Sequence, residues 1–406
     1  MAKSDKRRAR QLAARKDKIR KQKAQNRSRS ADSRPGPVVT VTRENIAEAM
    51  TTAVALHSAD KFSAAGRIYR QVLAIAPDHP DALSSLAMIE FQARNYDQAT
   101  TLLEQVIATR GDNPGYHMNL GAVFAAAGNS AEAITCYQRA IELAPTYPDP
   151  YYNLGDLHLL TGHPDAAIEV FDDCMAAIGR EFHALAYKAH ALDDAGRHHD
   201  ARYLLDFDRY LKTYPFEAPD GYDSIEAFNA ALARHIRTHP TLQGNVMSTE
   251  HGKHTGELLR DPKGPMHAME QRIHEAIRWY INALPDDPDH PAVKWVPGAW
   301  KLTTWGVVMF DRGHERAHIH PNGWLSGVFY LSLPDLIGDP DRDHQGWLEF
   351  GRPTTELHVR SELTIRHCQP AYGQMFLFPS YFYHGTIPFR SNQRRICVSF
   401  DVEPAG

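Results

Sequence analysis

A period of 34 residues runs through the first half of the chain and constrains its fold more than any other feature. Five alanines follow it: Ala65, Ala99, Ala133, Ala167 and Ala201. Three further sets keep the same spacing: Pro80, Pro114 and Pro148; Leu86, Leu120 and Leu154; Gly128, Gly162 and Gly196. Each period accommodates two amphipathic helices, with alanine where helices cross closely, glycine in the turn and proline ending the second helix. We therefore expect a helical repeat array over residues 44–210.

The repeats resemble the tetratricopeptide repeat, most fully over residues 119–145 (NLGAVFAAAGNSAEAITCYQRAIELAP) and 153–175 (NLGDLHLLTGHPDAAIEVFDDCM). The resemblance covers about residues 47–205. It implies a right-handed α-solenoid whose concave groove holds a protein or peptide partner. Four aromatic or polar residues are candidates to line that groove, although regularly spaced aromatic residues in repeats more often belong to the core: Tyr116, Tyr151, Tyr152 and Asn153.

The formal charge of −4 is unevenly distributed along the chain. Residues 1–35 contain 14 lysines and arginines and three aspartates, which is about +11 and leaves about −15 for the rest. Such a segment cannot bury apolar surface, so we predict a disordered basic tail over residues 1–40. The tail suits contact with the phosphates of a nucleic acid or the ribosome. A solvated extension without a partner and a mitochondrial presequence are the alternatives.

The four cysteines, Cys136, Cys174, Cys368 and Cys397, form no CxxC pair and no disulfide framework. This scatter suits a reducing compartment and argues against a structural zinc site. The chain also lacks the apolar stretch of a secretory signal and any run of about 18 apolar residues. We therefore expect a soluble, cytoplasmic protein without a membrane partner.

Residues 211–294 lose the repeat register and form a lead-in to the next domain. Two stretches with apolar residues at helical spacing, residues 223–239 and 265–284, are predicted to be helices packed on the outside of the following sheet. Between them, residues 248–262 contain too many glycines, histidines and threonines for a regular element. The histidines here, His251, His254 and His267, are expected to be exposed or core residues and not metal ligands.

From Val293 onward, short apolar and β-branched runs alternate with Gly, Pro and Asp. The candidate strands are AVKWVP, WKLTTWGVVMF, LSGVFYLSL, GWLEFG, LTIRHCQP, GQMFLFP and RRICVSFDV. Strands in such number without an intervening helical period indicate an antiparallel sandwich or a jelly-roll barrel.

Three histidines in this series have the spacing of metal ligands. His318 and His320 are two residues apart, so both side chains point to the same face, and His384 follows 64 residues later at the end of another predicted strand. Ligands from two distant strands leave one face of a metal open, which lets iron(II) bind a co-substrate and oxygen together. Arg395 opens the apolar strand RRICVSF, and a guanidinium inside a barrel needs an anionic partner such as a dicarboxylate.

Residues 295–404 resemble the iron(II)- and 2-oxoglutarate-dependent oxygenases, on the texts HIHPNGWLSGVFYL, GWLEFGRP, QPAYGQMFLFPSYFYHGTIPF and RRICVSF. The resemblance is greatest to the bacterial and phage branch with a His-x-His-Pro motif. It implies a double-stranded β-helix (jelly-roll) barrel with flanking helices, in which His318 and His384 bind iron and Arg395 binds the far carboxylate of 2-oxoglutarate. Tyr330 and Ser399 fall where related barrels place hydroxyls near that carboxylate.

One position departs from the common motif of that superfamily. His-x-Asp or His-x-Glu is usual, and position 320 is histidine. We take His320 as the third ligand, although three neutral imidazoles leave the iron with a higher net charge than two imidazoles and a carboxylate. The alternatives are that His320 and Asn322 take the motif's two places, or that a nearby carboxylate is the ligand: Asp311, Glu315 or Glu349.

The sequence leads to three hypotheses of different classes. The first is an iron(II)- and 2-oxoglutarate-dependent dioxygenase that hydroxylates a protein or peptide partner recruited by the repeats. The second is a non-catalytic repeat adaptor with a degenerate barrel. The third is a three-histidine iron dioxygenase that does not use 2-oxoglutarate. Arg395 favours the first over the third, because its place inside the barrel calls for an acidic co-substrate.

Overall fold

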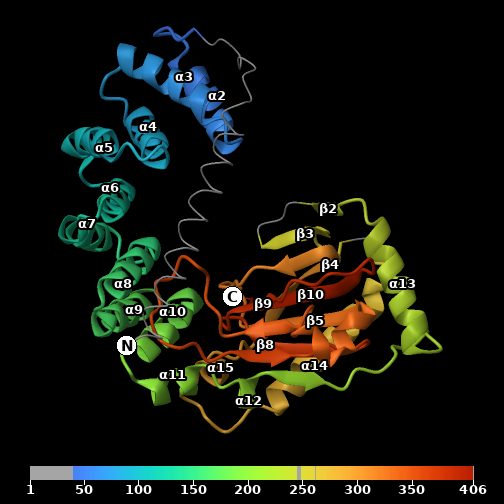
Figure 1. Ribbon diagram of the computed structural model, residues 1–406. Coiled ribbons are helices and arrows are strands. Elements are labelled where there is room, and N and C mark those ends of the chain that lie inside the picture. Colours follow the sequence, from blue (N-terminus) through green and yellow to red (C-terminus); the bar gives the residue numbers. More distant parts are fainter. Residues whose placement is uncertain (1–39, 245–247, 261, 406) are drawn as a thin grey trace. The chain divides into compact units, whose positions relative to one another are not determined.

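The computed structural model describes residues 40–244, 248–260 and 262–405 (Figure 1). The basic tail expected over residues 1–40 therefore lies outside the described residues, except for Thr40. The chain forms two compact units, one up to Val123 and the other from Phe124 onward.

The repeats form successive pairs of helices. In chain order they are α2 (Ile46–Ser58), α3 (Phe62–Ile75), α4 (Pro80–Gln92), α5 (Tyr96–Arg110), α6 (Pro114–Ala127), α7 (Ser130–Leu143), α8 (Asp149–Thr161), α9 (Pro164–Ile178), α10 (Phe182–Asp194) and α11 (His198–Leu204). The five alanines of the 34-residue period are all buried, at 0 or 1% exposure, as expected for residues between packed helices.

The turn inside each repeat uses a left-handed backbone at the same position of the period. Gly128, Gly162 and Gly196 have φ of 92, 86 and 74°. The equivalent residues of the first two repeats, Asp60 and Arg94, adopt φ of 58 and 65° although neither is glycine. This confirms the predicted role of the glycines, since they adopt that conformation without steric cost.

The prediction for the repeated prolines was wrong. Pro80 and Pro114 are the first residues of α4 and α6, and Pro148 directly precedes α8. They therefore begin the first helix of the next repeat and do not end the preceding helix. Proline suits a helix start because the first turn needs no backbone N–H donor.

Two of the aromatic residues considered for the groove contact other repeat residues. Tyr151 is buried, and its hydroxyl donates to the carbonyl of Pro145 at 3.0 Å, so it belongs to the core. The ring of Tyr152 lies 4.4 Å from that of His183 and 5.9 Å from that of Tyr187. Tyr116 and Asn153 are half-buried.

The second unit contains two antiparallel sheets, as expected for a jelly roll. The larger has seven strands in the order β1-β8-β5-β10-β4-β3-β2, and the smaller has the order β7-β6-β9. The strands are β1 (Lys212–Tyr214), β2 (Gln243–Gly244), β3 (Thr249–His254), β4 (Trp300–Glu315), β5 (Leu325–Ser332), β6 (Leu348–Phe350), β7 (Arg366–Cys368), β8 (Met375–Pro379), β9 (His384–Thr386) and β10 (Arg395–Pro404). The predicted β-rich domain behind the repeats is confirmed.

Two local predictions were wrong. AVKWVP was expected to be a strand, but Pro291–Lys294 form the short helix α15, because Pro291 suits a helix start and His290 caps it by accepting from the N–H of Ala292. Residues 248–262 were expected to be irregular, but Thr249–His254 form β3. Backbone pairing with β4, interrupted by a register shift between Glu250 and Gly252, outweighs their low strand propensity.

Helices α13 (Ile225–Thr238) and α14 (Met266–Asn282) lie beside the seven-stranded sheet (Figure 1). Ile236 of α13 lies so close to Gly306 of β4 that a Cβ there would come within 2.6 Å of it. The ring of Tyr280 of α14 lies 5.9 Å from that of Trp324. The expected packing of these helices on the sheet is confirmed. The remaining short helices are α12 (Phe207–Tyr210) and two 3-10 turns, Asp335–Gly338 and Pro340–Arg342. None of the described helices is long and apolar enough to cross a membrane.

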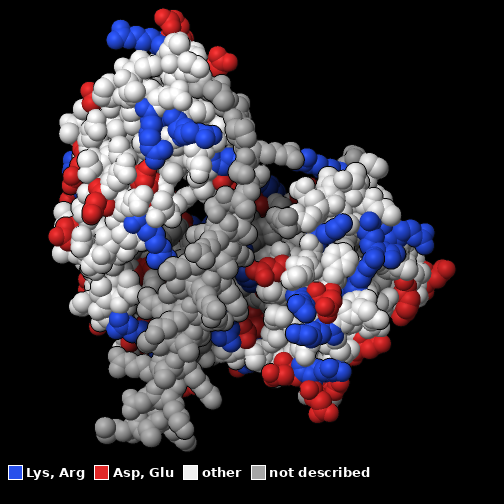
Figure 2. Space-filling model, turned by 45° about the horizontal axis from the view of Figure 1, so that its top comes forward, with Lys and Arg blue, Asp and Glu red and all other residues white. Residues whose placement is uncertain are grey.

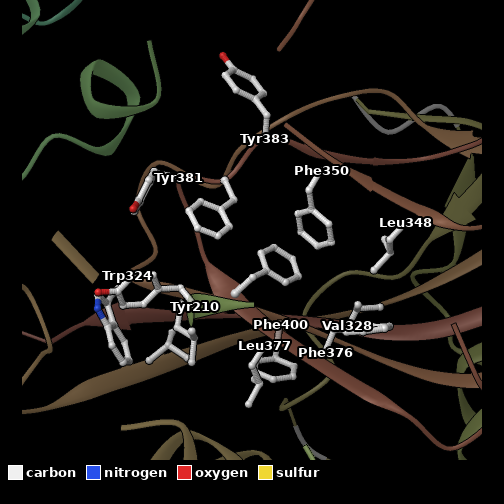
Figure 3. Close-up of a cluster of buried hydrophobic side chains, with 14 of the residues drawn as sticks. Tyr210, Trp324, Val328, Leu348, Phe350, Phe376, Leu377, Tyr381, Tyr383 and Phe400 are labelled. Carbon is white, nitrogen blue, oxygen red and sulfur yellow. The ribbon is translucent and has the colours of Figure 1, made fainter. Parts of the chain in front are cut away.

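Apolar side chains from both sheets meet between them. Figure 3 shows Leu348 and Phe350 of the smaller sheet facing Val328 and Phe400 of the larger one. Phe400 packs directly on the backbone of Gly327, where a Cβ would come within 2.2 Å of its ring. This packing holds the two sheets around the cavity described below.

Residues 352–365, which connect β6 to β7, dock on the last two repeats within the second unit. The N–H and the Nδ1 atom of His358 each lie 2.8 Å from the carboxylate of Asp156 on α8. The N–H groups of Arg360 and Ser361 donate to the carboxylate of Asp194 on α10, at 2.9 and 2.6 Å. We call residues 352–365 the docking loop. These contacts lie inside the compact unit that runs from Phe124 onward.

Replacing Asp194 tests how much the docking loop stabilises this unit. Asp194→Ala should lower its free energy of unfolding by about 1–2 kcal/mol, because two backbone donors lose their acceptor. All six tryptophans lie beyond residue 124, so urea unfolding followed by tryptophan fluorescence reports on this unit alone. The control is Asp200→Ala, which breaks an exposed ion pair with Arg197 and should change stability by less than about 0.5 kcal/mol. Equal effects of the two substitutions would contradict a stabilising role for the docking loop.

Candidate metal and co-substrate site

Two backbone hydrogen bonds connect the sheets at the predicted metal site. The N–H of His318 donates to the carbonyl of His384, and the N–H of His384 donates to the carbonyl of His318, both at 3.0 Å. The N–H of His320 donates to the carbonyl of Ser380, also at 3.0 Å. The backbones of all three histidines are therefore fixed by residues distant in sequence.

The side chains of these three histidines converge. One ring nitrogen from each of His318, His320 and His384 lies within 4.8 Å of the others. Their ring centroids are 4.4 to 5.1 Å apart. No carboxylate or thiol of the described residues joins this group. The donor set is thus three imidazoles, a combination that suits iron, zinc or copper.

The second ring nitrogen of each histidine contacts a hydrogen-bond acceptor. Nδ1 of His318 lies 2.7 Å from the carbonyl oxygen of Arg316. Nδ1 of His384 lies 2.9 Å from the carbonyl oxygen of Phe382. In His320, Nδ1 lies 2.8 Å from Oδ2 of Asp401. Because these oxygens only accept, each Nδ1 carries a hydrogen, which leaves Nε2 as the nitrogen available to a metal. Metal-binding histidines are held in the same way.

The protonation of the cluster differs from one ring to the next. Burial, followed by the neighbouring imidazoles, holds the pKa of His384 well below its usual value. Burial also lowers the pKa of His318. Burial opposes the charge of His320 as well, but the charge and the hydrogen bond of Asp401 outweigh it and raise the pKa of His320. Burial therefore favours the neutral form of His318 and His384, which is the form that binds a metal, whereas His320 has to give up any second proton when a metal binds.

Arg395, the first residue of β10, is 1% exposed. Its Nη2 donates to the hydroxyl of Tyr330 at 3.2 Å, and its Nη1 has only the sulfur atoms of Met309 and Cys397 at 3.5 and 3.9 Å. Its Nε has no hydrogen-bond partner. No carboxylate in the described part of the chain lies within ion-pair distance of it. A buried, unpaired guanidinium is destabilising by several kcal/mol, so its retention points to an anionic ligand.

The residues predicted for the site line one cavity between the two sheets. It is bordered by the three histidines, Arg395, Ser399 and Glu315. Tyr330 does not line it but accepts a hydrogen bond from Arg395. In this structure the cavity measures only about 20 Å³, close to the space of one water molecule. A five-carbon dicarboxylate therefore requires the lining side chains to move apart.

Of the other candidates for a third ligand, only Glu315 borders this cavity. Asn322 and Asp311 are exposed, and Asp311 accepts from the N–H of Ser391. Glu349 is held by Arg352 at 2.5 Å and by His367 at 3.1 Å. Among the described residues the converging group contains His320 and none of these four alternatives.

Glu315 belongs to a second polar group. Its Oε1 accepts from the hydroxyl of Thr249 at 3.4 Å and lies 3.4 Å from Nε2 of His254, which also contacts Thr249. Burial raises the pKa of Glu315, but the hydrogen bond of His254 and nearby positive charges hold it well below its usual value. His254, taken from the sequence as an exposed or core residue, is a core residue that holds an ionised carboxylate beside the metal cluster.

A larger cavity of about 410 Å³ adjoins the first at Glu315. Its walls include Arg316, Glu349, His367 and Thr386, so it lies beside the backbone pair of His318 and His384. The hydroxyl of Thr386 is buried without a hydrogen-bond partner among the described residues. We call this the outer cavity.

Asp401 is a residue that the sequence analysis did not identify. It lies on β10 six residues after Arg395, and side chains at even separations on a strand share a face. That alternation, applied from Arg395 through Cys397 and Ser399, would have found it. Its pairing with His320 depends on the sheet register and has no local signal.

Helical repeats followed by a histidine-lined jelly roll define the architecture, and the family comparisons agree with it. The family model described as "Putative 2OG-Fe(II) oxygenase" matches residues 303–401. Models of tetratricopeptide repeats match residues 56–122, 124–162 and 148–178. The chain therefore carries tetratricopeptide repeats followed by a segment of the 2OG-Fe(II) oxygenase type.

Among solved structures, one similar chain is the MamA protein, with 23% identity over 39% of this chain and 87% of that chain, at a TM-score of 0.36. Another is TTC0263, a tetratricopeptide repeat protein of Thermus thermophilus, with 18% identity over 40% and 90% of the two chains and a TM-score of 0.33. A search of curated proteins found no match.

Metal binding should require the three histidines together. Replacing His318, His320 or His384 with alanine is expected to abolish binding of iron(II), measured by anaerobic equilibrium dialysis, because each removes one of three ligands. His314→Ala is the matched control, since His314 precedes the cluster and its Nδ1 also contacts a backbone carbonyl. Undiminished iron binding by His320→Ala would remove His320 from the ligand set and make Glu315 the next residue to test.

Proposed function

We propose that this chain is a cytoplasmic iron(II)- and 2-oxoglutarate-dependent dioxygenase that hydroxylates a protein or peptide recruited by the repeats. His318, His320 and His384 hold the iron, and Arg395 binds 2-oxoglutarate with help from Tyr330 and Ser399. The observation that carries the proposal is a buried guanidinium without a carboxylate partner in the described residues, bordering the same cavity as three imidazoles whose Nδ1 atoms are already bonded.

Iron(II), when bound with 2-oxoglutarate and oxygen, supplies an oxidant that converts a C–H bond to C–OH while 2-oxoglutarate becomes succinate and carbon dioxide. The residues of the chain bind and orient the reactants. Arg395 offers a planar pair of donors for a carboxylate, and Tyr330 fixes one end of that guanidinium. Phe378 and Phe400, together with the packing of the two sheets, keep bulk water from the site.

The outer cavity is the proposed place of the substrate. Its volume of about 410 Å³ suits an amino-acid side chain with part of its backbone. It adjoins the metal cavity at Glu315 and is lined by Thr386, two residues after His384. The family assignments of the repeats support a protein or peptide as the substrate. Figure 2 shows acidic and basic side chains interspersed among the described residues.

Arg395→Met is the sharpest test of co-substrate binding. Loss of a buried charge-assisted contact costs about 2–3 kcal/mol, so the apparent KM for 2-oxoglutarate should rise more than tenfold while iron binding is unchanged. The same substitution should leave the unfolding free energy equal or higher, because it removes an unpaired buried charge. If Arg395 had a purely structural role, Arg395→Met would lower the free energy of unfolding.

The matched control is Arg394→Met. Arg394 is exposed, with its guanidinium over the ring of Phe310 at 5.7 Å, and its loss should change neither the KM nor the stability appreciably. A similar rise in KM for both variants would indicate a general charge effect and contradict a specific role for Arg395.

The reaction class is tested by adding iron(II) and 2-oxoglutarate to the full chain and measuring succinate. Slow formation of succinate without a substrate, abolished by His318→Ala, is expected. Consumption of oxygen without succinate would favour the three-histidine dioxygenase that does not use 2-oxoglutarate. Iron binding without any turnover, also in the presence of a partner protein, would favour the adaptor.

A further inference from the structure

The three imidazoles of the metal cluster do not have equivalent partners. His318 and His384 donate to backbone carbonyls, which are neutral. His320 alone donates to a carboxylate, that of Asp401, at 2.8 Å. Position 320 is also the one at which the common motif has a carboxylate. The common motif would place a carboxylate directly on the metal at position 320. Here the carboxylate of Asp401 lies on the far side of the His320 ring, at Nδ1.

Asp401 is held firmly in this position. It is 8% exposed, and its second oxygen, Oδ1, accepts from the hydroxyl of Ser326 at 2.6 Å. Ser326 in turn lies 2.8 Å from the hydroxyl of Ser380, whose backbone carbonyl accepts from the N–H of His320. The network returns to the histidine from which it starts, so the ring and the carboxylate are fixed relative to each other.

No lysine or arginine of the described residues neutralises Asp401. The ring of His320 is its one ion-pair partner in the described ranges. A buried carboxylate whose one ion-pair partner is an imidazole, with no lysine or arginine beside it, is unfavourable, so a purely structural role would be served better by asparagine or serine.

We propose that Asp401 is a positioning residue that acts through His320, giving this imidazole the negative charge that an aspartate ligand would bring to the metal. The proposal rests on the metal site of the proposed function and deepens it. Donation of the Nδ1 hydrogen to a carboxylate makes Nε2 a more basic and more negative ligand and fixes the orientation of the ring. The departure from His-x-Asp is thereby compensated by a residue 81 positions later in the chain.

The experiment compares the binding of cobalt(II) to the full chain and to Asp401→Asn. Cobalt(II) is stable in air and gives visible absorption bands that report the strength of its ligands. Asparagine keeps an oxygen acceptor for His320 but removes the charge. We expect 10- to 100-fold weaker binding, in the range measured when such partners of metal-bound histidines are removed, together with a shift of the visible bands. The control, Asp311→Asn, alters an exposed aspartate near the cluster in sequence and should change neither.

A second pair of variants separates the charge from a structural effect. In His320→Asp the carboxylate ligand is supplied at position 320 itself, so the charge of Asp401 is no longer needed for metal binding. The two neighbouring carboxylates instead repel each other. Adding Asp401→Asn to this variant should leave cobalt(II) affinity unchanged or increase it. An equal loss in both backgrounds would show that Asp401 acts through the fold and would overturn the proposal.

The outcomes distinguish this inference from the function on which it rests. If the unaltered chain binds cobalt(II) and Asp401→Asn binds it equally well with the same spectrum, the role of Asp401 is refuted and the metal site stands. If the unaltered chain binds no cobalt(II) or iron(II), the metal site itself is refuted and the role of Asp401 with it.

Discussion

The reciprocal pair of backbone hydrogen bonds between His318 and His384 is the contact on which the rest of the site depends. It joins the segment after β4 to β9 of the smaller sheet, so two residues 66 positions apart become direct neighbours. Backbone pairing sets the distance between Cα atoms much more narrowly than side-chain packing does. The ligand separation is therefore determined by the register of the barrel. The side chains then need only the correct ring orientation, which the Nδ1 acceptors supply.

Strand β10 places two opposite charges in a low-dielectric interior. Arg395 at its start and Asp401 six residues later lie on the same face, with Ser399 between them. Among the described residues, Arg395 has no carboxylate and Asp401 no lysine or arginine within ion-pair distance, and each borders the same cavity. The fold thus accepts two unfavourable burials on one strand. Such a combination is typical of a binding site, where ligands complete the electrostatics, and not of a structural core.

The sequence predicted those parts of the molecule that depend on local period and motif. The 34-residue spacing predicted the repeat helices, and the pattern of histidines and arginine predicted His318, His320, His384 and Arg395, which the structure brings to one cavity. Long-range pairing was not predictable. Strand β3 forms because β4 offers it hydrogen bonds, and the partnership of His254 with Glu315 follows from that register. The prolines were misassigned because proline fits both before and after a helix boundary.

The docking loop connects the wall of the outer cavity to the repeats. It joins β6, which carries Glu349, to β7, which carries His367, and both residues line that cavity. Its own backbone is fastened to Asp156 and Asp194 on two separate helices. Any change in the angle between α8 and α10 alters the spacing of these two anchor points. The residues that hold the loop therefore belong to the repeats, and the strands at its two ends, β6 and β7, supply Glu349 and His367 to the wall of the outer cavity.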